Sequence, residues 1–146
     1  MDICIQLSLI GGAAIFSTTG TYALRAFSIL ASAGEGRFLD ARQLALAAEA
    51  PPTYLVKLLG QFVRAGLLEA KKGAGGGFRL ARSAEDISLY EVLDLVEPQV
   101  RESDCILGRP NCNPRKACAL HATWAGVRSH LIEFLQSTSV ARLTGE

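Results

Sequence analysis

The fold is decided by residues 52–82, which read PTYLVKLLGQFVRAGLLEAKKGAGGGFRLAR. Proline is favourable at the first position of a helix, so Pro52 can begin one, and Gly66 is typical of the residue just beyond a helix end. Two short strand candidates, residues 67–71 and 78–80, flank a glycine-rich tip and predict a β-hairpin. The predicted helix buries one apolar stripe, formed by Leu55, Leu58, Leu59 and Phe62.

Two further helices are predicted upstream of residue 52. Apolar residues and alanines with helical spacing cover residues 18–33 and stop at Gly34. Asp40, followed three residues later by Gln43, has the pattern of a capping box and begins a short helix through residue 48. Three helices followed by a hairpin are the order of a winged helix-turn-helix. The sequence therefore predicts a mainly α fold with a small β-hairpin wing.

The charge distribution indicates DNA binding. The net charge is only +1, but residues 57–82 hold six basic side chains and one acid, whereas residues 83–104 hold seven acids and one base. A helix fits the major groove, and a basic tip with bare glycine backbone can approach phosphates. The alternative interpretation of these charges is a solvated surface without a binding role. The alternative role of Tyr54 is packing against the rest of the protein. We expect DNA contacts from Thr53, Tyr54, Lys57, Lys71, Lys72 and Arg79.

The C-terminal half predicts a long dimerisation helix. Ser88 and Glu91 form another capping-box pattern, which begins a helix reaching about residue 97, before Pro98. A loop over residues 99–117 follows, and the last helix covers about residues 119–136. Its apolar positions alternate spacings of four and three, as in a coiled-coil seam. We expect a homodimer interface formed by Leu120, Trp124, Val127, Leu131 and Phe134.

Three of the four cysteines are clustered in the sequence. Cys105, Cys112, Cys118 and His121 follow the spacing C-x₆-C-x₅-C-x₂-H. Thiolates are soft ligands that suit iron–sulfur clusters and zinc, although structural zinc sites favour shorter spacings between cysteines. Since Cys118 and His121 are three residues apart, about one turn of helix, we expect both to face one site at the start of the last helix. The spacing alone leaves an iron–sulfur cluster, a zinc site and a metal-free thiol switch open.

These features divide the chain into four predicted parts. Residues 1–15 are an N-terminal extension without an assigned role, and residues 16–98 are the winged helix-turn-helix DNA-binding domain. Residues 99–118 are the cysteine-rich loop, and residues 119–146 are the dimerisation helix and tail. The extension lacks the basic segment and cleavage site of a secretion signal, and no apolar run is long enough to span a membrane. We expect a cytoplasmic protein without a membrane partner.

No arrangement typical of catalysis is visible in the sequence. The chain has only two histidines, and neither a Ser/His/Asp arrangement nor a paired-carboxylate site stands out. We therefore expect a protein that is not an enzyme and has no small-molecule substrate.

Several segments together resemble one family of bacterial transcription regulators, the Rrf2 family. The resemblance extends from residue 16 to about residue 143, and its glycine-rich wing is specific. It departs from the family at Lys72, where relatives usually carry arginine, and at Val56, which is polar in some relatives; both departures bear on the DNA sequence that is read. The segments that carry it are Tyr22-Ala23-Leu24-Arg25, Tyr54-Leu55, Ala65-Gly66-Leu67-Leu68, and residues 72–82 with the sequence KGAGGGFRLAR.

The resemblance implies a homodimeric regulator, a repressor in many members, that binds a palindromic or semi-palindromic operator in double-stranded DNA. It also implies an iron–sulfur cluster held by Cys105, Cys112 and Cys118, which senses iron, nitric oxide, redox state or cluster supply. In one branch a histidine at the position of His121 is the fourth ligand of a 2Fe–2S cluster. In another, an acidic residue ligates a 4Fe–4S cluster; Thr21 stands there in this chain, so the 2Fe–2S form is favoured and the 4Fe–4S form stays open.

Overall fold

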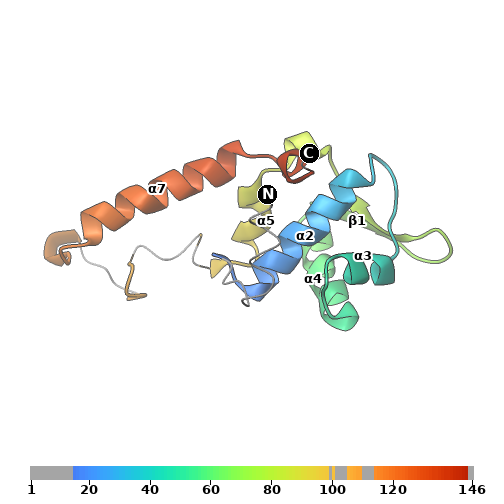
Figure 1. The fold of residues 1–146 in the computed structure, drawn as a ribbon, viewed down its shortest axis with the longest axis horizontal. Helices are drawn as coiled ribbons and strands as arrows, with labels where there is room; N and C mark the ends of the chain where they lie inside the picture. Colours follow the sequence, from blue (N-terminus) through green and yellow to red (C-terminus); the bar gives the residue numbers. More distant parts are fainter. Residues whose placement is uncertain (1–14, 99, 101–104, 110–113, 145–146) are drawn as a thin grey trace, which may run out of the picture.

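The computed structural model describes residues 15–98, 100, 105–109 and 114–144. The chain folds into a helical body that carries a two-stranded antiparallel sheet, and a long helix extends away from it (Figure 1). The elements are, in chain order, α2 (Thr18–Ser32), α3 (Ala41–Ala47), α4 (Pro52–Arg64), β1 (Leu68–Lys71), β2 (Gly77–Leu80), η2 (Ala84–Asp86), α5 (Leu89–Asp94), η3 (Pro114–Lys116), α7 (His121–Ser137) and η4 (Val140–Leu143).

Local signals fix where the helices of the body begin. The Asp40 side chain accepts hydrogen bonds from the backbone N–H groups of Arg42 and Gln43, at 2.9 and 3.4 Å, and begins α3. Pro52 is the first residue of α4, as predicted from its missing N–H and fixed φ. After α4, Gly66 has a φ of +78°, a left-handed conformation that favours glycine and ends the helix.

The core lies between α2, α4 and α5. The predicted stripe on α4 is confirmed, because Leu55, Leu58, Leu59 and Phe62 are all buried. Phe62 meets Phe27 of α2 edge to face, with the ring centroids 5.0 Å apart, a favoured geometry for aromatic pairs. This packing fixes the face that α4 buries and leaves its opposite face exposed.

The predicted wing is confirmed as a β-hairpin. β1 pairs antiparallel with β2, from Leu68 opposite Leu80 to Lys71 opposite Gly77. Leu39, before α3, exchanges backbone hydrogen bonds of 2.8 and 2.9 Å with Phe78, so the wing is anchored to the body. Gly77 has a φ of +133° and lies against this contact, where an added Cβ would overlap the Leu39 carbonyl oxygen. The observed elements are those of a mainly α winged helix-turn-helix.

The C-terminal half differs from the prediction in three details. α5 ends at Asp94 rather than near residue 97, and the chain turns before Pro98. The predicted loop contains a short 3₁₀ helix, η3, within its described part. The last helix begins at His121 rather than at residue 119. The predicted division of the chain into four parts stays a prediction, and residues 1–14 lie outside the described residues.

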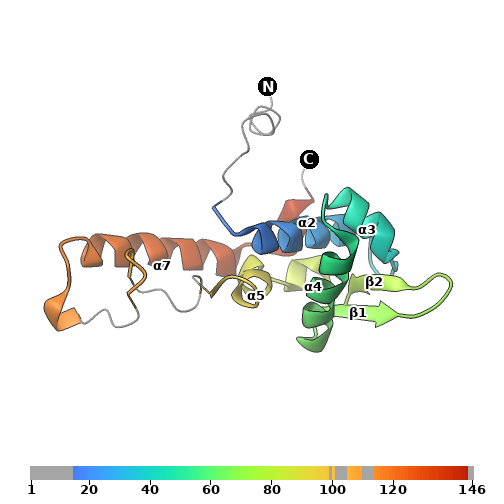
Figure 2. The ribbon, with the colours of Figure 1, turned by 90° about the horizontal axis from the view of Figure 1, so that it is seen from below.

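The chain end returns to the body after α7. Leu89 N–H donates to Thr138 O at 2.9 Å, and Val140 N–H donates to Ile87 O at 2.8 Å. These bonds flank an isolated bridge between the segments that precede α5 and follow α7. The Ser28 hydroxyl of α2 donates to Leu143 O at 3.0 Å. As a result, α7 is held at its C-terminal end and projects from the body at the other (Figures 1 and 2).

Candidate nucleic-acid interface and cysteine segment

The first turns of α4 present exposed side chains to one face of the molecule. Thr53 and Lys57 are exposed, as a DNA-reading role requires. Tyr54 is 42 % exposed, yet its hydroxyl is hydrogen-bonded to the Thr19 hydroxyl, and its ring meets the Tyr22 ring edge to face at 6.0 Å. Tyr54 therefore anchors the start of α4 to α2, and the packing role considered for it is present in the structure.

The wing tip carries exposed positive charge. Lys71 and Lys72 are both exposed at the end of β1, directly before the glycine-rich turn. The Lys71 ammonium lies 5.8 Å from the centroid of the Phe38 ring, within the range of a cation–π interaction. α4 and the two strands lie on one side of the body, while α7 extends from the opposite side (Figure 2).

Arg79 is engaged within the protein. Its guanidinium forms an ion pair with Glu69 across the hairpin, with an N–O distance of 2.6 Å. It also donates to Gly36 O at 3.3 Å and lies 4.5 Å from the centroid of the Phe38 ring. Arg79 thus stabilises the base of the wing, and its predicted contact with DNA stays a prediction.

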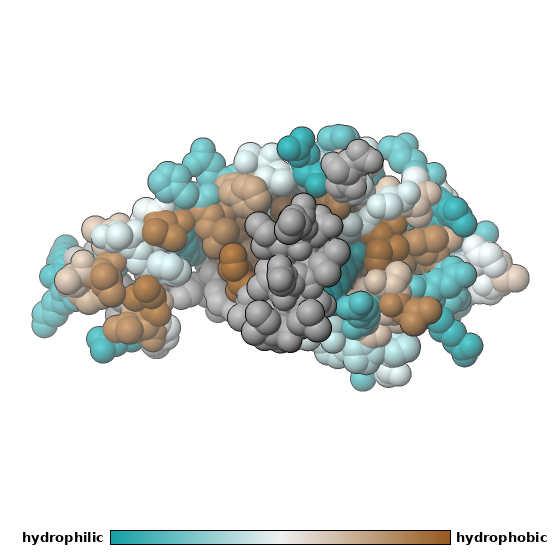
Figure 3. Space-filling model, in the orientation of Figure 1, coloured by the Kyte–Doolittle hydropathy of each residue, from teal (hydrophilic) through white to brown (hydrophobic). Residues whose placement is uncertain are grey.

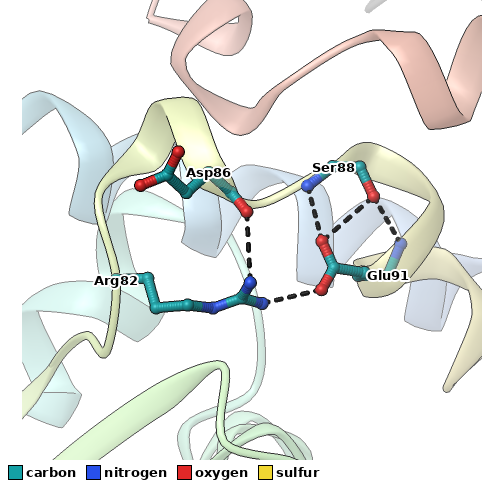
Figure 4. A network of polar contacts seen from close by, with 4 residues as sticks. All are labelled: Arg82, Asp86, Ser88 and Glu91. Atoms are coloured by element: carbon teal, nitrogen blue, oxygen red, sulfur yellow. Dashed lines mark hydrogen bonds and ion pairs between the residues drawn. The ribbon is translucent and has the colours of Figure 1, made fainter.

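A second arginine joins the wing to α5. Arg82 donates to the backbone oxygen of Asp86 at 3.2 Å and to the Glu91 carboxylate at 2.7 Å (Figure 4). Glu91 also accepts from Ser88 N–H at 2.9 Å, and Ser88 Oγ accepts from Glu91 N–H, so the predicted capping box is confirmed. Partial burial raises the pKa of Glu91, but the hydrogen bonds from Arg82 and Ser88 and the charge of Arg82 outweigh it, so this pKa lies below its usual value.

The cysteine segment is described in part. Cys105 is buried and Cys118 is exposed, whereas Cys112 lies outside the described residues. α7 begins at His121 rather than near residue 119, so Cys118 lies before the helix, and the expectation that Cys118 and His121 face one site stays a prediction. Cys118 occupies the turn before α7, where its carbonyl oxygen accepts from His121 N–H at 3.0 Å. Within the described part of the chain, no three potential metal ligands are gathered at one place.

Cys105 borders a cavity of about 390 Å³ between α7 and the body. The cavity is largely apolar, and Phe16, Val100 and Leu131 contribute to its wall. Trp124 also borders the cavity, and its indole N–H is buried without a hydrogen-bond partner among the described residues. Val100, Cys105 and one side of α7 therefore face the same space.

The predicted seam of α7 splits into two groups. Trp124 and Leu131 are half-buried and border the cavity within their own chain. Leu120, Val127 and Phe134 are exposed, the last two by 55 % and 56 %, and Val127 also reaches the wall of the cavity. Apolar side chains are visible on the α7 side of the molecule in Figure 3. The exposed group is spaced seven residues apart, so these three residues recur along one side of the helix.

Sequence reasoning missed one buried acid. Glu97 is 1 % exposed and accepts hydrogen bonds from both Ser17 N–H and the Ser17 hydroxyl, at 2.7 and 2.6 Å. Its partner lies 80 residues away in the sequence, so no local pattern marks the contact. The one available signal was Ser17 followed three residues later by Gly20, a capping pattern that lacks its acidic residue.

Comparison with known proteins identifies the family of this chain. The sequence model of the Rrf2 family, described as an iron-dependent transcriptional regulator, matches residues 16–146. The chain belongs to the Rrf2 family. Rrf2 proteins are transcription regulators that bind DNA, and the matched region includes both the winged helix-turn-helix and the cysteine segment.

Individual Rrf2 proteins are similar over most of the chain. The HTH-type transcriptional regulator IscR of Cereibacter sphaeroides is 31 % identical over 129 residues, which cover 86 % of this chain and 83 % of that protein. The structure of CymR, the global cysteine regulator of B. subtilis, has a TM-score of 0.74 at 23 % identity and covers 90 % of this chain and 97 % of CymR. T. potens IscR has a TM-score of 0.70 at 23 % identity, with coverages of 90 % and 86 %. These two likenesses confirm the fold class.

The described helices include none that is both long and apolar enough to cross a membrane.

Proposed function

We propose that this Rrf2 protein is a homodimeric DNA-binding repressor whose affinity for its operator is controlled by an iron–sulfur cluster held by Cys105, Cys112, Cys118 and His121. The observation that carries the proposal is the position of the cysteine segment. It leads from the end of α5 into α7, so two of its cysteines lie beside the helix that carries the exposed apolar row. A change in this segment therefore acts at once on the DNA-binding body and on the proposed dimer interface.

The DNA-binding half of the proposal rests on exposed side chains. Thr53 and Lys57 on α4 read base edges in the major groove, while Lys71 and Lys72 contact phosphates beside the wing. Arg79 supports the wing from within. Such a protein acts on double-stranded DNA in the cytoplasm and needs no small-molecule substrate.

The described residues fit an iron–sulfur cluster chemically. Thiolates are the preferred ligands of such clusters, and Cys118 is exposed in the turn before α7, near the positive end of the helix dipole, which favours a negative group. Arg109, Arg115 and Lys116 are exposed in the same segment and offset negative charge. His121 is the first residue of α7 and supplies a nitrogen ligand for a 2Fe–2S form; a 4Fe–4S form takes its fourth ligand elsewhere. When bound, the cluster supplies a redox-active centre sensitive to iron supply, oxidants and nitric oxide.

The experiment is anaerobic purification followed by absorption spectroscopy and counts of iron and sulfide. We expect a brown protein, and Cys105→Ser or Cys118→Ser should remove the visible absorption because an open iron site is lost to solvent and oxygen. His121→Ala should keep absorption but shift the spectrum, since replacing an imidazole changes the charge on iron. Cys4→Ser is the control and should leave the spectrum unaltered.

Two other outcomes contradict the cluster while leaving DNA binding intact. Protein that contains zinc but no iron or sulfide identifies a zinc-stabilised DNA-binding module. Metal-free protein whose operator affinity changes between reduced and oxidised samples identifies a thiol switch. The second outcome has a specific motive, since the fold is also that of a global cysteine regulator.

A further inference from the structure

The first turn of α2 is capped by two segments far apart in the sequence. Ser17 is the N-cap residue, and its hydroxyl oxygen accepts from Gly20 N–H at 3.1 Å. In an ordinary capping box, a Glu or Gln side chain at the position of Gly20 would accept from the N-cap N–H. Here the Glu97 carboxylate accepts from Ser17 N–H at 2.7 Å and from the Ser17 hydroxyl at 2.6 Å. Glu97, which follows α5 in the chain, thus accepts the N-cap hydrogen bond that an acid within the helix accepts in an ordinary capping box.

The local capping box of α5 shows the same pattern of bonds. Glu91 accepts from Ser88 N–H at 2.9 Å and from the Ser88 hydroxyl at 3.1 Å. The difference lies in the third residue after each serine, which is Glu91 itself in α5 and Gly20 in α2. An added Cβ at Gly20 would overlap the Glu97 carboxylate oxygen, so glycine at this position makes room for the distant acid.

Glu97 is joined on its other side to the cysteine segment. Its backbone N–H donates to Leu93 O at 2.8 Å, and its carbonyl oxygen accepts from Val100 N–H at 3.0 Å. Glu97, Val100 and Cys105 border the same cavity of about 390 Å³. A displacement of Val100 therefore reaches Glu97 through one short turn of backbone.

The same first turn of α2 also holds the start of α4. The Thr19 hydroxyl is hydrogen-bonded to the Tyr54 hydroxyl, and the Tyr22 ring contacts the Tyr54 ring. Thr53 and Lys57, the residues proposed to read bases, flank Tyr54 on α4. The first turn of α2 is therefore the place where the cysteine side and the reading side of the molecule meet.

We infer that Glu97 is a positioning residue, which caps α2 from a distance and thereby sets the start of α4 relative to the cysteine segment. The inference rests on the proposed function, because it assumes that α4 reads DNA and that the cysteine segment carries the signal. Displacement of Glu97 uncaps the first turn of α2, and Thr19 then ceases to hold Tyr54. The buried Glu97 carboxylate and the first turn of α2 therefore move together.

The test is a double-mutant cycle on DNA affinity. The probe is a duplex that the wild-type protein selects from a randomised library, and binding is measured by fluorescence anisotropy. Glu97→Gln keeps the size of the side chain and should weaken binding roughly 5- to 10-fold, as expected for lost hydrogen bonds to a charged group. Adding Tyr54→Phe should weaken it less than about twofold further, because the anchor of Tyr54 is already loose.

Glu91→Gln is the matched control. It removes an equivalent capping carboxylate from α5 but does not touch α2, so its effect should multiply with that of Tyr54→Phe. The amides of the first turn of α2 should exchange hydrogen faster in Glu97→Gln than in Glu91→Gln. If the effects of Glu97→Gln and Tyr54→Phe multiply as the control does, the inference is wrong. Should Glu97→Gln fail to fold, Ser17→Ala replaces it in the cycle; this variant removes the hydroxyl bonds to Glu97 and Gly20 and keeps the bond from the backbone N–H to Glu97.

The same binding assay tests whether Cys105 affects DNA affinity through Glu97. Cys105→Ser should change the affinity of the wild-type protein for the selected duplex but have little effect in the Glu97→Gln background. An equal effect in both backgrounds overturns the inference and leaves the proposed function standing. No effect of Cys105→Ser in the wild-type protein overturns control by the cysteine segment, and failure to select any duplex overturns DNA reading itself; the inference falls with either.

Discussion

At the scale of single residues, Glu91 and Glu97 both accept a hydrogen bond from the N-cap N–H of a helix. Glu91 lies within the helix that it caps, whereas Glu97 lies far from its helix in the sequence. Glu91 caps its own helix, and the spacing from Ser88 was sufficient to predict it. Glu97 caps a helix 80 residues away, and nothing in its own neighbourhood marks that role. Local capping can be predicted from the spacing of residues in the sequence, whereas long-range capping depends on which elements pack together.

The lowered pKa of Glu91 predicts a pH-dependent stability. A carboxyl group whose folded pKa lies below its unfolded value stabilises the protein above the unfolded value, about 4.3, and loses that contribution as the pH falls through the folded value. Glu91→Gln should therefore lower the free energy of unfolding at pH 7 by more than at pH 3. Urea unfolding at several pH values measures the difference; a constant difference would contradict the ion pair with Arg82.

Gly20 should resist even the smallest substitution. Gly20→Ala places a methyl group against the Glu97 carboxylate, so the free energy of unfolding should fall by about 1–3 kcal/mol, the usual cost of overpacking. Gly60→Ala is the matched control, because Gly60 lies within α4 and an added Cβ there meets only ordinary contacts. It should stabilise by up to about 1 kcal/mol through better helix propensity. Equal effects in thermal unfolding would show that Gly20 is not packed as described.

At the scale of elements, the wing should act through charge rather than through base recognition. Lys71→Ala with Lys72→Ala should weaken binding to all duplexes and reduce the slope of log affinity against log salt by about 0.9 for each lost phosphate contact. Arg142→Ala, which removes an exposed charge from η4, is the control and should leave the slope unchanged. A changed sequence preference with an unchanged slope would instead place these lysines on bases.

The sequence predicted those elements whose ends are marked by a capping residue, a proline or a glycine. Asp40, Pro52 and Ser88 begin helices where expected, and the glycine-rich turn joins two paired strands. Prediction failed where a boundary depends on packing. α5 ends at Asp94 without a terminal glycine, and α7 begins at His121 without a side-chain cap, so no local residue type marks either place. For the same reason, the sequence placed the start of α7 two residues too early.

The candidate site divides along similar lines. Exposure of Thr53, Lys57 and the wing lysines follows from the buried stripe of α4 and from the hairpin, both of which are periodic features of the sequence. The anchoring of Tyr54 on α2 is a tertiary contact that periodicity does not encode, and the ion pair of Arg79 with Glu69 depends on the register of the hairpin. The predicted metal ligands and dimer residues stay predictions.

At the scale of the whole molecule, the exposed row on α7 predicts the oligomeric state. Val127→Asp with Phe134→Asp places two charges on this row and should convert the dimer to monomers with weak operator binding, while the fold is kept because both side chains are exposed in the single chain. Leu131 is less suitable for this test, because it also packs against the core of its own chain. Sedimentation velocity measures the outcome.

The control for this experiment is another exposed apolar side chain. Leu46 on α3 is 83 % exposed, and Leu46→Asp should leave the sedimentation coefficient of the dimer unchanged. If the α7 variant sediments as an unchanged dimer, this helix is not the interface.

α7 is attached to the body along its C-terminal half and less at its start. Its 17 residues span about 25 Å at 1.5 Å per residue. Hydrogen bonds just beyond its C-terminal end join the chain to the segment before α5, Leu135 is buried in the core, and Arg128 donates to Val100 O at 3.5 Å. A tilt of about 5° about the C-terminal end moves the start of α7, next to Cys118, by roughly 2 Å, as follows from that length. In a symmetric pair the displacement doubles between the two copies. A small tilt of α7 thus moves the proposed dimer helix beside Cys118 by more than a hydrogen bond tolerates.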